Sequence, residues 1–123
     1  MEKKELAEKI QALVDLVARL RGPGGCPWDA RQKDRSISSY LLEEAYEVVD
    51  AVDLVNPAEV LTELGDLLFQ ILFLVDLASE REEFDLTDVI DGITAKMIRR
   101  HPHVFGGASV EGPEEVEIGR AHV

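Results

Sequence analysis

Apolar side chains recur every three or four residues over most of this chain, which is the spacing of an amphipathic α-helix. The pattern predicts helices over about residues 4–20, 36–55, 57–80 and 85–100, and it predicts no strand. Glycine and proline in the segment RGPGGCPWD separate the first two helices. The expected fold is therefore all-α, a four-helix bundle-like domain.

The third predicted helix is apolar on nearly every side from Leu67 to Ala78. Such a helix is central rather than peripheral, and a bundle this small offers few neighbours to cover it. We therefore expect the domain to dimerise through its central helices. The pair Asn56-Pro57 predicts where this helix begins, with asparagine as N-cap and proline at the first helical position. Ser36 is the expected N-cap of the helix before it.

Composition narrows the class of protein. The 123 residues suffice for one domain, and 46% hydrophobic with 31% charged residues is typical of a globular chain. A net charge of −12 argues against a general partner of nucleic acids or anionic membranes. Cys26 is the single cysteine, so an internal disulfide is excluded, and the first ten residues lack the hydrophobic region of a signal peptide. A cytoplasmic location is expected.

Two pairs of carboxylates lie inside the apolar helical segments. Glu44 and Glu47 form an E-x-x-E pair, and Glu63 and Asp66 form an E-x-x-D pair whose flank also carries Gln70. Residues three apart share a helix face, and the short connection between the two helices predicts an antiparallel hairpin that brings the pairs level. Converging carboxylates require a cation. Oxygen ligands alone favour Mg²⁺, with Mn²⁺ or Ca²⁺ as substitutes, and four carboxylates accommodate one or two ions.

Two other interpretations of these acids stay open. They can form a solvated acidic face near the favourable N-terminus of a helix, although Asp66 directly precedes an apolar run. They can also belong to a di-iron carboxylate bundle, but the Glu-x-x-His motifs of such bundles are absent.

The last predicted helix ends in a basic segment, KMIRRHPH. Lys96 and Arg100 are one turn apart and share a face. Cations stabilise a helix C-terminus, which is one explanation, and binding of phosphate oxygens is another. A basic segment of this kind beside an acidic metal site indicates a polyphosphate substrate. His101 and His103 are expected to have structural roles.

The loop GGCPWD contains the single tryptophan, Trp28. Its ring can stack on a nucleobase or cover the end of the bundle, and covering is the favoured interpretation. Cys26 has no activating partner in the sequence and is expected to be a small buried residue.

Four segments together resemble the MazG family of nucleoside triphosphate pyrophosphohydrolases: RLRGPGGCPWDARQ, YLLEEAYEVVDAVD, ELGDLLFQILF and KMIRRHPHVFG. The resemblance covers about residues 13–107. It implies an all-α, Mg²⁺-dependent enzyme that converts a nucleoside triphosphate to the monophosphate and pyrophosphate in nucleotide-pool housecleaning. It also implies homo-oligomers built on dimers.

The resemblance further assigns roles to residues. The two carboxylate pairs match the metal ligands, and Lys96 and Arg100 match positions that contact phosphates. Glu43 matches the first acid of the family's E-E-x-x-E, so Glu43 and Glu47 are the candidates for orienting or activating water. Trp28 joins the substrate-binding candidates.

One departure from the family pattern lies near the end of the sequence. After HPHVFG the family continues through a W-E-x-x-K segment, whereas this chain continues to EEVEIGRAHV. Residues 1–107 are expected to form the catalytic domain, and residues 108–123 an acidic, glycine-containing and poorly ordered tail or linker. The missing segment leaves open a non-catalytic nucleotide-binding or dimerisation domain of a longer two-domain protein. A purely structural helical bundle, whose acids are only solvated, is a further alternative.

Overall fold

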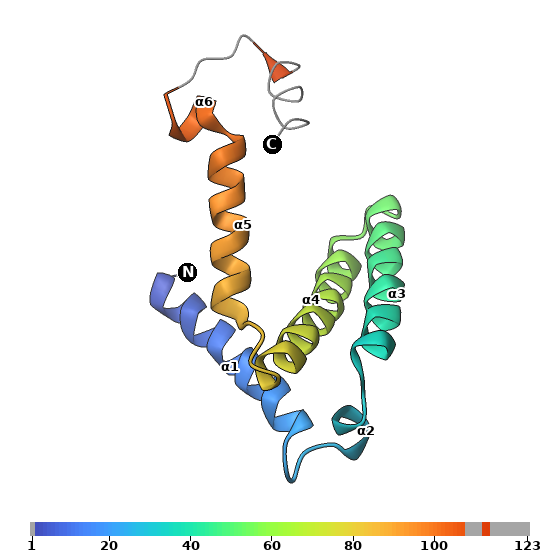
Figure 1. The fold of residues 1–123 in the computed structure, drawn as a ribbon. Coiled ribbons are helices and arrows are strands. Elements are labelled where there is room, and N and C mark those ends of the chain that lie inside the picture. The colour runs from blue at the N-terminus through green and yellow to red at the C-terminus, as the bar shows by residue number, and fades with distance from the viewer. Residues whose placement is uncertain (1, 108–111, 114–123) are drawn as a thin grey trace. The chain divides into compact units, whose positions relative to one another are not determined.

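The computed structural model describes residues 2–107 and 112–113, and every regular element in them is a helix (Figure 1). The helices are α1 (Lys3–Arg21), α2 (Pro27–Ala30), α3 (Asp34–Asp53), α4 (Pro57–Glu80), α5 (Leu86–Arg100) and α6 (Pro102–Phe105). The all-α prediction is confirmed. None of the described helices combines the length and the hydropathy that crossing a membrane requires.

The chain divides into two compact units, residues 1–85 and residues 86–123. The first unit contains α1 to α4, and the second contains α5 and α6. All four long helices predicted from the sequence are present, but the fourth, α5, belongs to the second unit. A bundle of all four therefore stays a prediction, as does dimerisation. The tail predicted for residues 108–123 lies outside the described residues, apart from 112–113.

The helix boundaries follow the local sequence, with one correction. The side-chain oxygen of Asn56 accepts a hydrogen bond from the Glu59 N–H at 3.3 Å, which confirms the predicted cap of α4. The prediction that Ser36 caps α3 is wrong, because the helix begins at Asp34 and Lys33 is the N-cap. The Ser36 hydroxyl instead reaches back one turn and accepts a hydrogen bond from the Lys33 N–H at 3.0 Å.

Helices α3 and α4 form the predicted antiparallel hairpin and lie side by side (Figure 1). The turn is short because Val55 adopts a left-handed conformation, with φ of 52°, directly after the C-cap of α3. Asn56 and Pro57 then start α4 without further residues between the helices. This connection fixes which turn of α3 faces which turn of α4.

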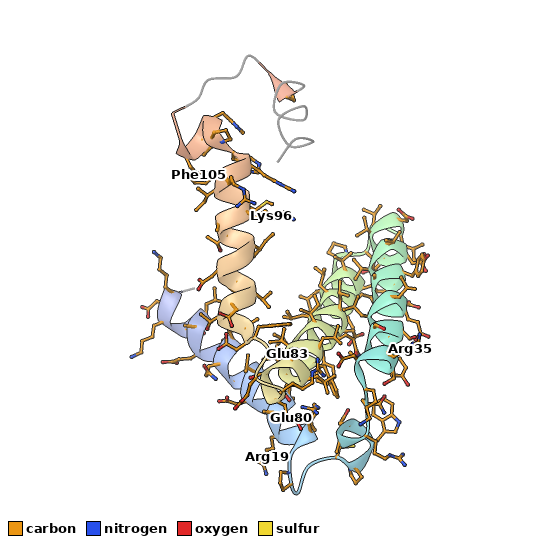
Figure 2. The ribbon with its side chains drawn as sticks, in the orientation of Figure 1. Arg19, Arg35, Glu80, Glu83, Lys96 and Phe105 are labelled. Atoms are coloured by element: carbon orange, nitrogen blue, oxygen red, sulfur yellow. The ribbon has the colours of Figure 1, made fainter. Side chains whose placement is uncertain are left out.

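The core of the first unit forms around the C-terminal half of α4, which also packs against α1. Its buried apolar side chains are Val17, Ile37, Ala51, Leu72, Phe73, Val75, Leu77 and Ala78. Arg21, near the end of α1, forms ion pairs with Asp76 and Glu80, each at 2.6 Å. Figure 2 labels Glu80 at the end of α4, where this bond to α1 is made.

Candidate functional site

Three carboxylates converge between α3 and α4. One oxygen from each of Glu44, Glu63 and Asp66 lies within 4.8 Å of the others. Glu44 and Glu63 are partly buried, whereas Asp66 is exposed. The antiparallel hairpin produces this meeting, because it places the middle of α3 opposite the first half of α4. We refer to these three residues as the acidic cluster.

The donor set suits a hard divalent cation. Oxygens that bind one Mg²⁺ at about 2.1 Å lie up to about 4.2 Å apart, and those of Ca²⁺ lie up to about 5 Å apart. The oxygens of the acidic cluster, all within 4.8 Å of one another, are therefore close enough to share one such ion. A set of carboxylate oxygens without sulfur or imidazole also favours Mg²⁺ or Mn²⁺ over softer metals.

The electrostatics of the acidic cluster are unfavourable without a cation. Partial burial raises the pKa of Glu44 above its usual value, and the charges of Asp66, Glu47 and Glu43 raise it further. Burial also raises the pKa of Glu63, again with Asp66 as the largest charge effect. Every charged group that shifts these two pKa values is a carboxylate. Binding a cation would remove this repulsion.

Glu47 and Glu43 lie at the edge of the acidic cluster rather than inside it. Glu47 is exposed and outside the group of three, yet its charge raises the pKa of both Glu44 and Glu63. Glu43 is also exposed, and its charge raises the pKa of Glu44 but not that of Glu63. The structure thus brings together three of the four predicted metal ligands and places the fourth beside them.

Trp28 lies on α2 with its ring against Tyr40 of α3, at 5.8 Å between centroids and 41° between planes. The indole is 47% exposed, so one part covers the neighbouring helix while the other is open to a ligand. Tyr40 precedes Glu44 by one turn, and its place beside Trp28 could not be predicted without the loop conformation.

The basic candidates lie on α5, in the second unit. Lys96 and Arg100 are one turn apart and partly buried, and Figure 2 labels Lys96 on this helix. Their contact with phosphates stays a prediction. His101 follows α5, with its Nδ1 2.6 Å from the carbonyl oxygen of Met97 and its ring 5.4 Å from that of His103. These contacts agree with the structural roles expected for the two histidines.

Comparison with known proteins agrees with the motifs. The model of the MazG nucleotide pyrophosphohydrolase domain matches residues 32–105. The chain is 45% identical over 103 residues to the Thermotoga maritima protein named nucleoside triphosphate pyrophosphohydrolase/pyrophosphatase MazG. The aligned region covers 84% of this chain and 40% of that protein. It is also 45% identical over 109 residues to the Escherichia coli K12 protein named nucleoside triphosphate pyrophosphohydrolase, and this alignment covers 88% of the present chain and 41% of the relative.

A third relative is the Bacillus subtilis protein named uncharacterized protein YabN, 39% identical over 115 residues. The match covers 94% of this chain and 24% of that protein. The chain therefore spans about two-fifths or less of the length of these three relatives.

Proposed function

Because the chain belongs to the MazG family, we propose that it hydrolyses nucleoside triphosphates to the nucleoside monophosphate and pyrophosphate. The observation that carries this proposal is the convergence of Glu44, Glu63 and Asp66 within 4.8 Å of one another in the α3–α4 hairpin. The names of the Thermotoga and Escherichia relatives support the reaction. Removal of damaged or surplus nucleotides in the cytoplasm is the physiological role that we propose.

The acidic cluster would hold Mg²⁺, or Mn²⁺ in its place, with Glu47 as a further ligand on the exposed side. When bound, such an ion polarises phosphate oxygens and lowers the pKa of a coordinated water. With a cation bound, the carboxylates would no longer repel the polyanionic triphosphate. Their raised pKa values accord with a site that is completed by a cation.

Glu47 is our choice for the residue that orients the attacking water. It is exposed, it borders the acidic cluster, and it belongs to the same face of α3 as Glu44. The water oxygen forms a bond to the α-phosphorus, and the bond from that phosphorus to the bridging oxygen breaks. Glu47 accepts the proton of the water, and pyrophosphate leaves. We propose that Glu43, which directly precedes Glu44, assists by orienting a metal ligand or by helping to activate the water.

Lys96 and Arg100 complete the proposal as phosphate contacts. An ammonium and a guanidinium one turn apart match the spread charge of a triphosphate, and both stabilise the charge that develops on the leaving pyrophosphate. Trp28, with nearly half of its surface exposed, is proposed to contact the nucleoside.

We further propose that two copies of the chain pair through the α3–α4 hairpin. An open apolar cavity of about 670 Å³ lies at the hairpin turn. Its lining consists of Val52, Val55, Asn56, Pro57, Val60, Leu61 and Leu64. Val55 is 82% exposed and Leu61 73% exposed, which is a large apolar surface to leave in contact with water.

The substitution Glu47→Gln tests the assignment of the site. It keeps the size of the side chain but removes the charge and the ability to accept a proton, so pyrophosphate release should fall by about a hundredfold or more while the fold persists. Glu8→Gln on α1 makes the same chemical change at an exposed position and should leave turnover unchanged. Full activity of the Glu47→Gln protein, with the control behaving as expected, would refute the role of Glu47.

The alternative function is a non-catalytic domain that binds nucleotide or dimerises within a longer protein. The chain continues from HPHVFG to EEVEIGRAHV without the family's W-E-x-x-K segment, which motivates this alternative. It predicts nucleotide binding without release of pyrophosphate, so measurable Mg²⁺-dependent turnover excludes it.

A further inference from the structure

Gln70 of α4 has a side-chain oxygen, Oε1, that is buried and accepts no hydrogen bond from any described residue. Gln70 follows Asp66 by one helical turn and Glu63 by two turns, so the three residues share a face of α4. Phe73 and Leu77, both buried, continue the same face towards the core. The amide therefore lies where the acidic cluster gives way to apolar packing.

The side chains one or two turns away on the same face of α4 limit what this oxygen can bind. Buried acceptors in folded proteins are nearly always paired. The carboxylates of Glu63 and Asp66 are themselves acceptors when ionised, and Phe73 has no polar atom to offer. Side chains on a helix lean towards its N-terminus, which directs the Gln70 amide towards the turn that carries Asp66. A donor for Oε1 is therefore best supplied by a ligand of the acidic cluster.

The residues of α3 opposite Gln70 indicate which part of a ligand would lie near this amide. In the antiparallel hairpin, Glu44 of α3 meets Glu63 and Asp66. One turn further from the hairpin turn, α3 carries Tyr40 and α4 carries Gln70. Tyr40 is in ring contact with the half-exposed Trp28.

An amide at the same level of the hairpin as a pair of aromatic rings has the chemistry that recognises a nucleoside rather than a phosphate. Aromatic faces stack on bases, and a neutral amide pairs with N–H and O–H donors without attracting or repelling charge. The acidic cluster, by contrast, suits the triphosphate through its cation. The two ends of a nucleotide thus have matching surroundings on neighbouring turns of the hairpin.

We propose that Gln70 is a specificity-determining residue whose Oε1 accepts a hydrogen bond from an N–H or O–H group on the nucleoside part of the substrate. This inference rests on the proposed function, since it assumes that the acidic cluster holds the triphosphate. The donor is either an amino or imino group of the base or a hydroxyl of the sugar, which share this chemistry.

The substitution Gln70→Met tests the proposal, because methionine keeps the length of the side chain and removes both polar atoms. KM for nucleoside triphosphates should rise about tenfold, the effect of one lost hydrogen bond to a ligand, while kcat changes less. Inhibition by inorganic tripolyphosphate should be unchanged, because tripolyphosphate has no nucleoside. Gln11→Met on α1, where the exposed glutamine donates a hydrogen bond to Asp15, is the matched control.

Comparing four bases and both sugars identifies the donor. A rise in KM that differs between bases assigns the donor to the base, and a rise confined to ribonucleotides assigns it to the 2′-hydroxyl; either result supports the proposal. Unchanged KM for every nucleotide would overturn it. So would an equal weakening of tripolyphosphate inhibition, which would place Gln70 at the phosphates.

The test also separates this inference from the proposed function. If the unmodified protein releases no pyrophosphate, the proposed function fails, and calorimetric binding of nucleotide and of tripolyphosphate in the presence of Mn²⁺ then takes the place of KM. Weaker nucleotide binding by Gln70→Met, with unchanged tripolyphosphate binding, would still support Gln70 as a nucleoside contact. Gln70→Leu replaces the methionine variant if that variant does not fold.

Discussion

Glu44 illustrates how the hairpin changes an ordinary carboxylate. Burial and the nearby charge of Asp66 raise its pKa, and Glu63 is affected in the same way. A carboxyl group whose pKa is higher in the folded state contributes stability below its unfolded pKa of about 4.3. That contribution is lost as the pH rises through the folded pKa. At neutral pH the fold therefore contains a repulsion that a bound cation can relieve.

The first prediction concerns the pH dependence of stabilisation by metal. Mg²⁺ or Mn²⁺ should raise the melting temperature more at about pH 7 than at about pH 5, because protons compete for carboxylates with raised pKa values. Thermal denaturation at both pH values measures the effect. Glu44→Gln should abolish most of the stabilisation without lowering the metal-free melting temperature at pH 7, since it removes one of the repelling charges. Equal stabilisation at both pH values would contradict this account.

The site residues differ in how far the sequence could predict them. The spacing of Glu63 and Asp66 fixes their shared face, because helix geometry is local. The position of Glu47 outside the acidic cluster depends on the rotation of α3 about its axis, which packing of the buried Ile37 and Ala51 determines. Such rotation is a property of the tertiary structure, and no spacing within α3 reveals it.

Among the elements, the loop between α1 and α2 depends on two glycines with different roles. Gly24 has a φ of 78°, which favours glycine. A Cβ atom on Gly25 would lie 2.2 Å from the carbonyl oxygen of Arg19 and 2.5 Å from that of Leu20. The Cys26 N–H also donates to the Leu20 carbonyl at 2.7 Å, so the loop cannot move away without losing this bond. Only glycine fits at position 25.

The second prediction follows from this close approach. Gly25→Ala should destabilise the protein by about 1–3 kcal/mol, the usual cost of forcing an extra methyl group into a packed region. Gly65→Ala is the matched control, because its added Cβ would meet nothing within 4 Å beyond the adjoining backbone of its own helix, and alanine favours a helix interior. Chemical denaturation should show opposite signs for the two variants, and a stabilised Gly25→Ala protein would be incompatible with the loop structure.

The short helices show where prediction of elements fails. α2 and α6 have four residues each, too few for a repeating apolar pattern, so the sequence showed only the prolines that begin them. The long helices were predictable because each spans several turns. The start of α3 was missed because the Ser36 hydroxyl bonds back to Lys33 from inside the helix instead of capping it.

At the scale of the whole molecule, the exposed apolar surface of the hairpin is the feature that a single copy leaves unexplained. Leu61 is 73% exposed and lines the apolar cavity at the hairpin turn. The third prediction is that the protein sediments as a dimer and that Leu61→Glu shifts it to a monomer in sedimentation velocity, because a charge buried unpaired in the proposed interface opposes association. Leu6→Glu on α1, at a position that is 50% exposed, should leave the dimer intact. A dimer that persists in Leu61→Glu would exclude this surface.

The sequence predicted the all-α class and the family, since both depend on periodicity and ordered motifs. It did not predict the division into residues 1–85 and 86–123, because periodicity describes each helix and not which helices pack together. The proposed phosphate contacts Lys96 and Arg100 belong to the second unit. Measurements of activity, rather than the spacing of these residues along α5, must therefore establish their role.

The most direct test of the proposed reaction is to separate the products formed from nucleoside triphosphates with and without Mg²⁺. We expect nucleoside monophosphate and pyrophosphate in equal amounts, formed only when the metal is present, because attack occurs at the α-phosphorus. Nucleoside diphosphate and inorganic phosphate would contradict it, since they would show that the terminal phosphate is the one removed.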